Sequence, residues 1–387
     1  MPRLSSWSLC VVAAVVAFGA IVACASPNKK MIESRGPVYQ IPLWNCTAWA
    51  GPPPPPATNV TQLHIQDIKV IMAVGDSIGA GFAMHSGPAD EPWALRLIEY
   101  RGDTFHMGGN EGQYSLANFL KVYNPDLIGA SVGETLPLDA IKWKEGVIEP
   151  FVPHITHLNA AQSQAKIENV AKQVDYLIEQ LNTTYAKTVN MTHDWKMLNL
   201  LIGANNLCGA CFNRSYADPD YYEQTLDAIV GQIYQNIPRT VVNLIALFNI
   251  SQVHTFAMTS EYCRVMWKDI VKTECMCLQG DATDADRLAM DVRTVEFNRR
   301  INLVASRWQA KQLLEFNVKV QPFAQNMRIP SLSYLSELDC FHPHAYADAA
   351  FAIGLWNNIQ TPDAEKESDL NPATIGFQCP TKDTILY

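Results

Sequence analysis

The sequence has no internal repeat, no excess of basic side chains and, after its first 25 residues, no apolar run long enough to span a bilayer. Without repeats, its 387 residues are compatible with one large domain. Its 29 basic and 38 acidic residues give a net charge of −9, which disfavours a general attraction to nucleic acid or to anionic lipid. Any contact with a membrane or micelle surface is therefore expected to be local, apolar and transient.

Residues 1–25 have the pattern of a secretory signal peptide. Arg3 gives a positive start, Leu9 to Val22 form an apolar core, and Ala23-Cys24-Ala25 offers small residues for cleavage before Ser26. An uncleaved anchor is the competing interpretation, but the run is shorter than the roughly 20 residues that a transmembrane helix needs. We therefore expect a secreted protein without a carboxyl-terminal membrane anchor.

Beyond this leader the sequence contains an even number of cysteines, which in an oxidising compartment predicts disulfides. Cys208 and Cys211 form a Cys-x-x-Cys pair that could instead serve redox chemistry or zinc, but there is no second such pair, so structural bridging is favoured. The connectivity cannot be read from the sequence. The cysteines are Cys46, Cys208, Cys211, Cys263, Cys275, Cys277, Cys340 and Cys379.

Asn-x-Ser/Thr sequons point to the same compartment, because glycans need surface positions in the secretory route. Glycosylation at Asn249 requires that the end of the apolar run Val241 to Phe248 be exposed to solvent. The sequons are Asn45, Asn59, Asn182, Asn190, Asn213 and Asn249.

The chain is predicted to consist of an N-terminal arm, residues 26–61, and a catalytic domain, residues 62–387. A polyproline spacer, Pro52 to Pro56, lies near the end of the arm. Apolar runs separated by segments long enough for crossover helices predict a three-layer α/β/α sandwich with a central, mostly parallel sheet. The predicted strands are Ile68 to Val74, Asp126 to Ser131, Met197 to Ile202, Val241 to Ala246 and Phe316 to Val320.

Three further segments have recognisable patterns. Ala345 to Ile359 is a long apolar stretch that predicts the final helix. Glu261 to Gly280 breaks the strand–helix alternation and carries three cysteines, which indicates an excursion held by disulfides. A helical apolar stripe that should pack on the sheet consists of Ile167, Val170, Val174, Leu177, Ile178 and Leu181.

The run Val70 to Ser77 is the first sign of chemistry. An apolar, β-branched strand leads into Gly75-Asp76-Ser77, and the glycine permits a turn that brings Ser77 to the carboxyl end of the strand, where ligand sites lie in open α/β sheets. An Asp-Ser helix cap is the alternative, because this tripeptide is common. The serine needs partners elsewhere in the chain to become a nucleophile.

Asp339-Cys340-Phe341-His342 supplies such partners. A serine hydroxyl is a poor nucleophile until a histidine takes its proton, and a carboxylate must hold that imidazole in the right tautomer. The spacing lets Asp339 and His342 face the same way over one turn, although an isolated Asp-x-x-His is commonly a surface turn or a helix cap. The remaining histidines are interpreted as solvated or capping; they include His85, His154, His157, His193, His254 and His344.

Two segments offer donors for an oxyanion. Within the segment Met197 to Cys208, an apolar strand is followed by Gly203-Ala204-Asn205. An asparagine at the end of a strand can donate its side-chain N–H to a developing negative charge. A turn residue that tolerates left-handed geometry is the alternative for Asn205. Gly108 and Gly109 form a glycine pair that exposes backbone N–H groups for the same oxyanion or for a tight turn.

The order of these motifs resembles the four blocks of the GDSL or SGNH hydrolase superfamily. Along the chain they are Gly-Asp-Ser, a glycine pair, Gly-x-Asn and Asp-x-x-His. The resemblance extends to the phospholipase B1-like (phospholipase B/lipase) branch and covers most of the chain after the leader. It depends on Tyr123 to Gly129, Asn206-Leu207-Cys208, Pro238 to Leu244, Cys275 to Leu278, Asp339 to His342 and Leu355 to Asn358.

The resemblance implies a role for each block. Ser77 would be the nucleophile, His342 its base and Asp339 the acid that orients the base. The oxyanion hole would consist of the Ser77 N–H, Gly108 and Asn205, with Gly109 as the alternative to Gly108. Hydrolysis would pass through an acyl-serine and would need no metal or organic cofactor.

The chain departs from the family pattern at two positions. Asn206 replaces the acid that usually follows the block-three asparagine, and His106 stands where a serine or asparagine usually precedes the block-two glycine. The first change could loosen the orientation of Asn205. The implied substrates are fatty acyl esters of glycerophospholipids or lysophospholipids; the alternatives are a general or carbohydrate esterase and a secreted binding protein with weakened catalysis. The sequence does not determine the oligomeric state.

Overall fold

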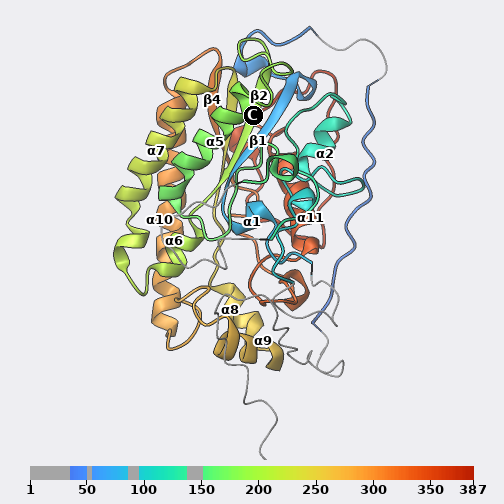
Figure 1. The fold of residues 1–387 in the computed structure, drawn as a ribbon. Coiled ribbons are helices and arrows are strands. Elements are labelled where there is room, and N and C mark those ends of the chain that lie inside the picture. The colour runs from blue at the N-terminus through green and yellow to red at the C-terminus, as the bar shows by residue number, and fades with distance from the viewer. Residues whose placement is uncertain (1–34, 50–54, 86–95, 137–150) are drawn as a thin grey trace, which may run out of the picture.

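A computed structural model describes residues 35–49, 55–85, 96–136 and 151–387, drawn in colour in Figure 1. The predicted signal peptide, residues 1–25, and most of the polyproline spacer lie outside these residues. Four parallel strands form one sheet in the order β1-β2-β3-β4. Their bounds are β1 Ile68–Gly75, β2 Trp195–Leu201, β3 Thr240–Ile245 and β4 Phe316–Gln321.

Helices cover both faces of this sheet. Parallel strands that follow one another in sequence need right-handed crossovers, which place all the connecting helices on one face. The three crossover helices α5 Val170–Asn182, α7 Pro219–Asn236 and α10 Asp284–Gln309 accordingly form one layer (Figure 1). α2 Leu116–Lys121 and α11 Ala345–Asn358 lie on the other side of the sheet. The predicted three-layer α/β/α sandwich is confirmed.

Shorter helices complete the described elements. They lie mainly in the loops at the carboxyl ends of the strands, on the lower side of the sheet in Figure 1. They are α1 Ser77–Ala80, α4 Pro153–Thr156, α6 Ala204–Gly209, α8 Gln252–Ala257, α9 Glu261–Val265 and a π-helical turn, Met266–Ile270.

The predicted apolar stripe forms the buried side of α5. Val170, Val174, Leu177 and Leu181 are all buried in the main core. The predicted final helix is confirmed as α11. Among the helices of the described residues, none combines the length and the apolar character that crossing a membrane would require.

The strand predicted at Asp126 to Ser131 does not form. Ile128 makes a single parallel bridge with Val70, and Ser131 makes another with Gly108. Between them Gly129 takes a φ of 110°, which turns the chain away from β1. Asn159 occupies the next position beside β1, paired with Ala73. The prediction was wrong because apolar content reports burial, whereas a strand also needs consecutive hydrogen bonds to one neighbour.

Disulfides tie the excursion of residues 261–280 to the loops around it. Cys263 is bonded to Cys340, Cys275 to Cys208 and Cys277 to Cys211. The Cys208-x-x-Cys211 pair therefore serves structural bridging, as predicted. Cys46–Cys379 fastens the N-terminal arm, whose Trp44 stacks on Phe119 with ring centroids 4.7 Å apart.

The six sequons lie at exposed or partly exposed positions. Asn249, whose glycosylation depends on an accessible strand end, is exposed in the loop between β3 and α8.

Gly75 provides a test of how tightly β1 and β2 approach each other. A Cβ on Gly75 would lie 2.5 Å from the Leu201 carbonyl oxygen, so we expect Gly75→Ala to destabilise the protein by at least about 1–3 kcal/mol. The matched control is Gly231→Ala in α7, where the nearest heavy atom would be 3.9 Å away; better helix propensity should stabilise this variant by about 0.5–1 kcal/mol. Chemical denaturation measures both free energies of unfolding, and a stable Gly75→Ala variant would contradict the close approach.

Candidate active site

Ser77 is the first residue of α1, immediately after the end of β1. The Asp76 carboxylate caps this short helix by accepting the Ile78 N–H at 3.0 Å, so the turn is a helix cap as well as a mount for the serine. The side-chain amide of Gln173 on α5 holds Gly75 through both its N–H and its carbonyl, at 2.8 Å each. The serine thus follows a strand end that is fixed on two sides.

His342 and Asp339 lie on the loop before α11. His342 Nε2 is 2.8 Å from Ser77 Oγ, and Nδ1 is 2.7 Å from Asp339 Oδ2. The other Asp339 oxygen accepts the backbone N–H groups of Phe341 and His342 at 2.8 and 3.0 Å. All three side chains are buried, and the fold therefore brings together the three residues predicted as a triad, although Ser77 and Asp339 are 262 positions apart in sequence.

The direction of these hydrogen bonds agrees with a serine nucleophile. The Asp339 carboxylate can only accept, so Nδ1 must carry the imidazole proton, which leaves Nε2 free to accept from Ser77 Oγ. The ring of Phe82 contacts the imidazole edge-on with centroids 4.8 Å apart and excludes water from one side.

Asn205 lies near the start of α6, in the loop that follows β2. Its Nδ2 donates one hydrogen bond to the Ala165 carbonyl oxygen at 2.9 Å, and the amide has a second N–H available for a ligand. Gly203 begins this turn at a φ of 129° and lets the chain bend sharply after the strand.

Gly108 does not fit the role predicted for it. Its N–H donates to the Thr104 carbonyl oxygen at 2.8 Å, and the N–H of the alternative, Gly109, donates to the Ser131 carbonyl oxygen at 2.7 Å. Both groups are committed to the loop's own structure, so we correct the prediction: neither glycine has a free N–H for an oxyanion.

His106, the other departure in that block, is fully buried beside α1. A Cβ on Gly79 would lie 3.0 Å from its Nε2, and burial lowers the pKa of His106 to about 3. The imidazole is therefore neutral, and it packs against Gly79 of α1 and against the ring of Phe105.

Gln164 takes a position that the sequence reasoning missed. It has a φ of 67° in a turn held on both sides: the Gln162 N–H donates to the Gly75 carbonyl, and the Ala165 carbonyl accepts from Asn205. Among the described residues, neither the Gln164 N–H nor the Ser77 N–H has a hydrogen-bond partner. A search for glycine could not find this position, because a glutamine adopts the left-handed conformation here.

A buried carboxylate fixes the same turn. Glu99 accepts from the Ser163 N–H at 3.2 Å and from its Oγ at 2.6 Å, and it is paired with Arg101 at 2.6 Å. Asn159 donates to the Gly79 carbonyl at 2.9 Å and so links the turn to α1. Glu99, Arg101 and Asn159 carried no recognisable signal in the sequence, because their partners are distant along the chain.

Glu274 adds a third ionisable group beside His342. Glu274, Asp339 and His342 form a group whose ligand atoms, within the described residues, lie within 4.8 Å of one another, close enough to hold a metal ion. However, Nδ1 of His342 carries the proton that it donates to Asp339, so the histidine nitrogen and the Asp339 carboxylate are already used by the triad.

The buried Asp76 carboxyl makes stability depend on pH. Burial raises its pKa to about 6, above the value of about 4 for an unfolded aspartate. The folded state therefore binds this proton more tightly, and stability should fall as pH rises from about 4 to about 6. We expect Asp76→Asn, which still caps α1, to stabilise the protein at pH 8 by up to about 3 kcal/mol and to have little effect at pH 4.

Thermal unfolding of both proteins from pH 4 to pH 8 measures this difference. Parallel curves for Asp76→Asn and the wild type would contradict it, because an ionisation that contributes to stability must change their separation.

Comparison with curated proteins finds relatives along most of the chain. It is 29% identical over 343 residues to the membrane-associated phospholipase B1 of Rattus norvegicus, covering 84% of this chain and 22% of the relative. The Homo sapiens phospholipase B1 is 28% identical over 325 residues, covering 80% and 20%. The chain thus spans about a fifth of the length of these relatives.

Among solved structures, an extracellular lipase from Streptomyces rimosus is 14% identical, covering 75% of this chain and 98% of that chain, with a TM-score of 0.34. A carbohydrate esterase is 15% identical, covering 76% and 69%, also with a TM-score of 0.34. The family model of the GDSL-like lipases and acylhydrolases matches residues 71–355, which include both Ser77 and His342. The chain therefore belongs to the GDSL-like lipase/acylhydrolase family, with a resemblance to its phospholipase B1 branch.

Proposed function

We propose that this protein is a secreted serine esterase that hydrolyses fatty acyl esters of glycerophospholipids and lysophospholipids through an acyl-serine intermediate. The observation that carries the proposal is the continuous hydrogen-bonded chain from Ser77 Oγ through His342 to Asp339, at 2.8 and 2.7 Å. The choice of phospholipid is supported by the similarity to phospholipase B1.

In the proposed first step, Ser77 Oγ attacks the ester carbonyl while its proton moves to His342 Nε2. The carbonyl π electrons move onto oxygen, and Asp339 stabilises the imidazolium that forms. Collapse of this intermediate breaks the bond to the alcohol, which takes the proton from Nε2 and departs. A water molecule then repeats the sequence on the acyl-serine, releasing the fatty acid and restoring the serine.

The negative oxygen needs donors that are already in place. We assign this role to the N–H groups of Ser77 and Gln164 and to the side-chain amide of Asn205. Support comes from the hydrogen bond between Asn205 and Ala165, the residue after Gln164, and from the bond between Gln162 and Gly75, two residues before Ser77. The turn at Gln164 is thereby held between the serine and the asparagine.

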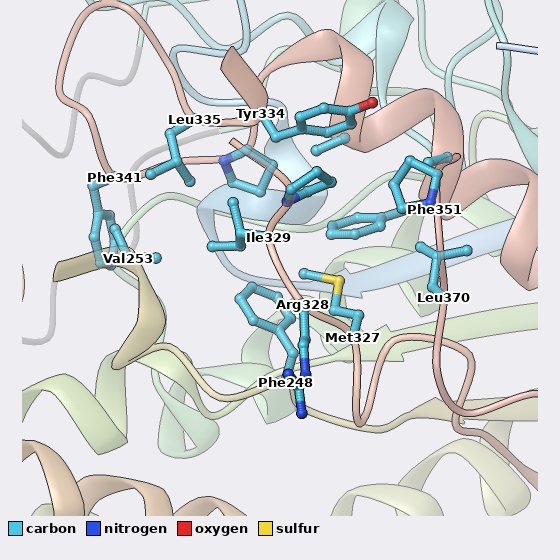
Figure 2. Close-up of a pocket in the computed structure, with 15 residues that line it drawn as sticks. Phe248, Val253, Met327, Arg328, Ile329, Tyr334, Leu335, Phe341, Phe351 and Leu370 are labelled. Atoms are coloured by element: carbon cyan, nitrogen blue, oxygen red, sulfur yellow. The ribbon is translucent and has the colours of Figure 1, made fainter. Parts of the chain in front are cut away.

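Apolar side chains surround the triad. Phe82, Ala83 and Leu338 form a small buried cluster against which Leu97 packs. Beside the histidine loop, Phe341 and Pro343 line an apolar pocket with a volume of about 30 Å³ (Figure 2). Figure 2 shows Phe248, Ile329 and Phe351 pointing into the same pocket. A cavity of this size does not hold an acyl chain, so the choice of a long acyl group rests on the similarity to phospholipase B1.

Secretion is supported by the four disulfides of the described residues and by the accessible sequons. A general or carbohydrate esterase of the same fold is the alternative activity, and a secreted binding protein with weakened catalysis is the alternative class.

We expect the purified protein to release fatty acid from phosphatidylcholine and lysophosphatidylcholine, and Ser77→Ala to lose this activity by at least about 10⁴-fold because its hydroxyl is the group that His342 activates. A short acyl ester and an acetylated sugar serve as control substrates. Ser77-dependent activity on the controls alone would replace the phospholipid proposal by the general or carbohydrate esterase. No turnover and no labelling by a serine-directed fluorophosphonate would favour the binding protein.

Substitutions at the proposed oxyanion donors should have different effects, because Asn205 donates through its side chain and Gln164 through its backbone N–H. Asn205→Ala should lower kcat by about 10²–10³-fold, because it removes a donor from the transition state. Gln164→Gly should keep activity within about 3-fold, because glycine retains the N–H and tolerates the positive φ. Steady-state kinetics measures both variants. A large loss in Gln164→Gly would show that the glutamine side chain, not its N–H, is required.

A further inference from the structure

A second carboxyl group faces the same nitrogen of the catalytic imidazole as Asp339. Glu274 Oε1 lies 3.5 Å from His342 Nδ1, while Asp339 Oδ2 lies 2.7 Å from it. Asp339 is the closer acceptor, and a small movement of the Glu274 side chain would bring its carboxyl within hydrogen-bond distance of Nδ1. A serine triad needs only one carboxylate at this nitrogen, so Glu274 is an addition that the mechanism above does not use.

The surroundings favour a proton on Glu274 while Asp339 is charged. The side chains of Glu274, His342 and Asp339 are only 17%, 6% and 2% exposed, and Glu274 Oε2 has no hydrogen-bond partner among the described residues. Burial, and then the negative charge of Asp339, raise the pKa of Glu274 well above its usual value. Asp339 and His342, both from the loop before α11, offer ligand atoms within 4.8 Å of the Glu274 carboxyl.

The segment that carries Glu274 is fastened on both sides of the active site. The neighbouring Cys275 is bonded to Cys208 on α6, the helix that also carries Asn205. Earlier in the same segment, Cys263 is bonded to Cys340, the residue after Asp339. Trp267 Nε1 also donates to the Asp339 carbonyl oxygen at 2.8 Å. These links hold the Glu274 carboxyl beside the histidine.

We propose that Glu274 is a positioning residue for His342, acting as a second carboxyl on Nδ1 that shares the control of the imidazole with Asp339. The inference rests on the proposed function, since it concerns the base of that reaction. In its protonated form Glu274 leaves one negative charge at the imidazole. When Glu274 releases its proton to solvent at higher pH, two carboxylates face the imidazolium and favour its formation as the serine proton arrives.

The proposal predicts two titrations at one histidine. In protein with isotope-labelled histidine, the NMR resonances of His342, identified by their loss in His342→Gln, should show two inflections, the second of which comes from Glu274. The second inflection should vanish in Glu274→Gln and persist in Asp269→Asn, a matched change at an exposed carboxyl of the same segment. This measurement needs no turnover, so it tests the proposal separately from the proposed function.

Kinetics supplies the second readout. In the wild type, kcat/KM for lysophosphatidylcholine should rise a further roughly 3- to 10-fold through the second ionisation, whereas the profile of Glu274→Gln should be flat there and that of Asp269→Asn should match the wild type. A merely structural role would lower activity equally at every pH. A single inflection in the wild-type resonances, or identical pH profiles for wild type and Glu274→Gln, would overturn the proposal. Because the number of inflections in the wild-type titration tests the proposal by itself, the test does not depend on whether Glu274→Gln folds.

Discussion

The arrangement of the site depends on how the end of β1 is held. Gly75 pairs with Leu201 in the next strand, and both of its backbone polar groups bind the side chain of Gln173 on α5. Its carbonyl also accepts the Gln162 N–H at 3.1 Å. One residue thus joins the strand that leads to Ser77, a crossover helix and the turn that carries Gln164. Since there is no room for a Cβ, the small residue is a condition for the whole arrangement.

The parts of the fold that could be predicted from sequence are those that periodicity or a short spacing reports. The strands were found as continuous apolar runs, since β2 and β3 are buried along their whole length, and the α5 stripe was found because one buried helix face repeats every three to four residues. Asp339 and His342 were singled out because they are three positions apart and a serine nucleophile needs both types of side chain. The strand expected at Asp126 to Ser131 failed for the converse reason: its apolar residues are buried, but Gly129 ends its pairing with β1 after one bridge.

The remaining parts depend on polar side chains whose partners are far away in sequence. Gln173 lies in an amphipathic helix and Glu274 in a cysteine-rich loop, and nothing local distinguishes either from a surface residue. The sheet contains a similar case, where Asn243 donates to Asn199 at 2.9 Å and accepts from Gln321 at 2.8 Å. Each of these residues is defined by a partner on another element, so its role becomes visible only when the elements are packed together.

Asn206 shows how such packing changes the meaning of a departure from the family pattern. Its Oδ1 accepts the Ile167 N–H at 2.9 Å, a task that a carboxylate could also perform. Its Nδ2 donates to the Tyr216 carbonyl at 3.0 Å and lies 3.3 Å from a Glu168 oxygen, where a carboxylate would meet two acceptors and be repelled. The amide is therefore the better group in these surroundings, and it fixes the start of α6 beside Asn205. The missing acid is thus no reason to infer weakened catalysis.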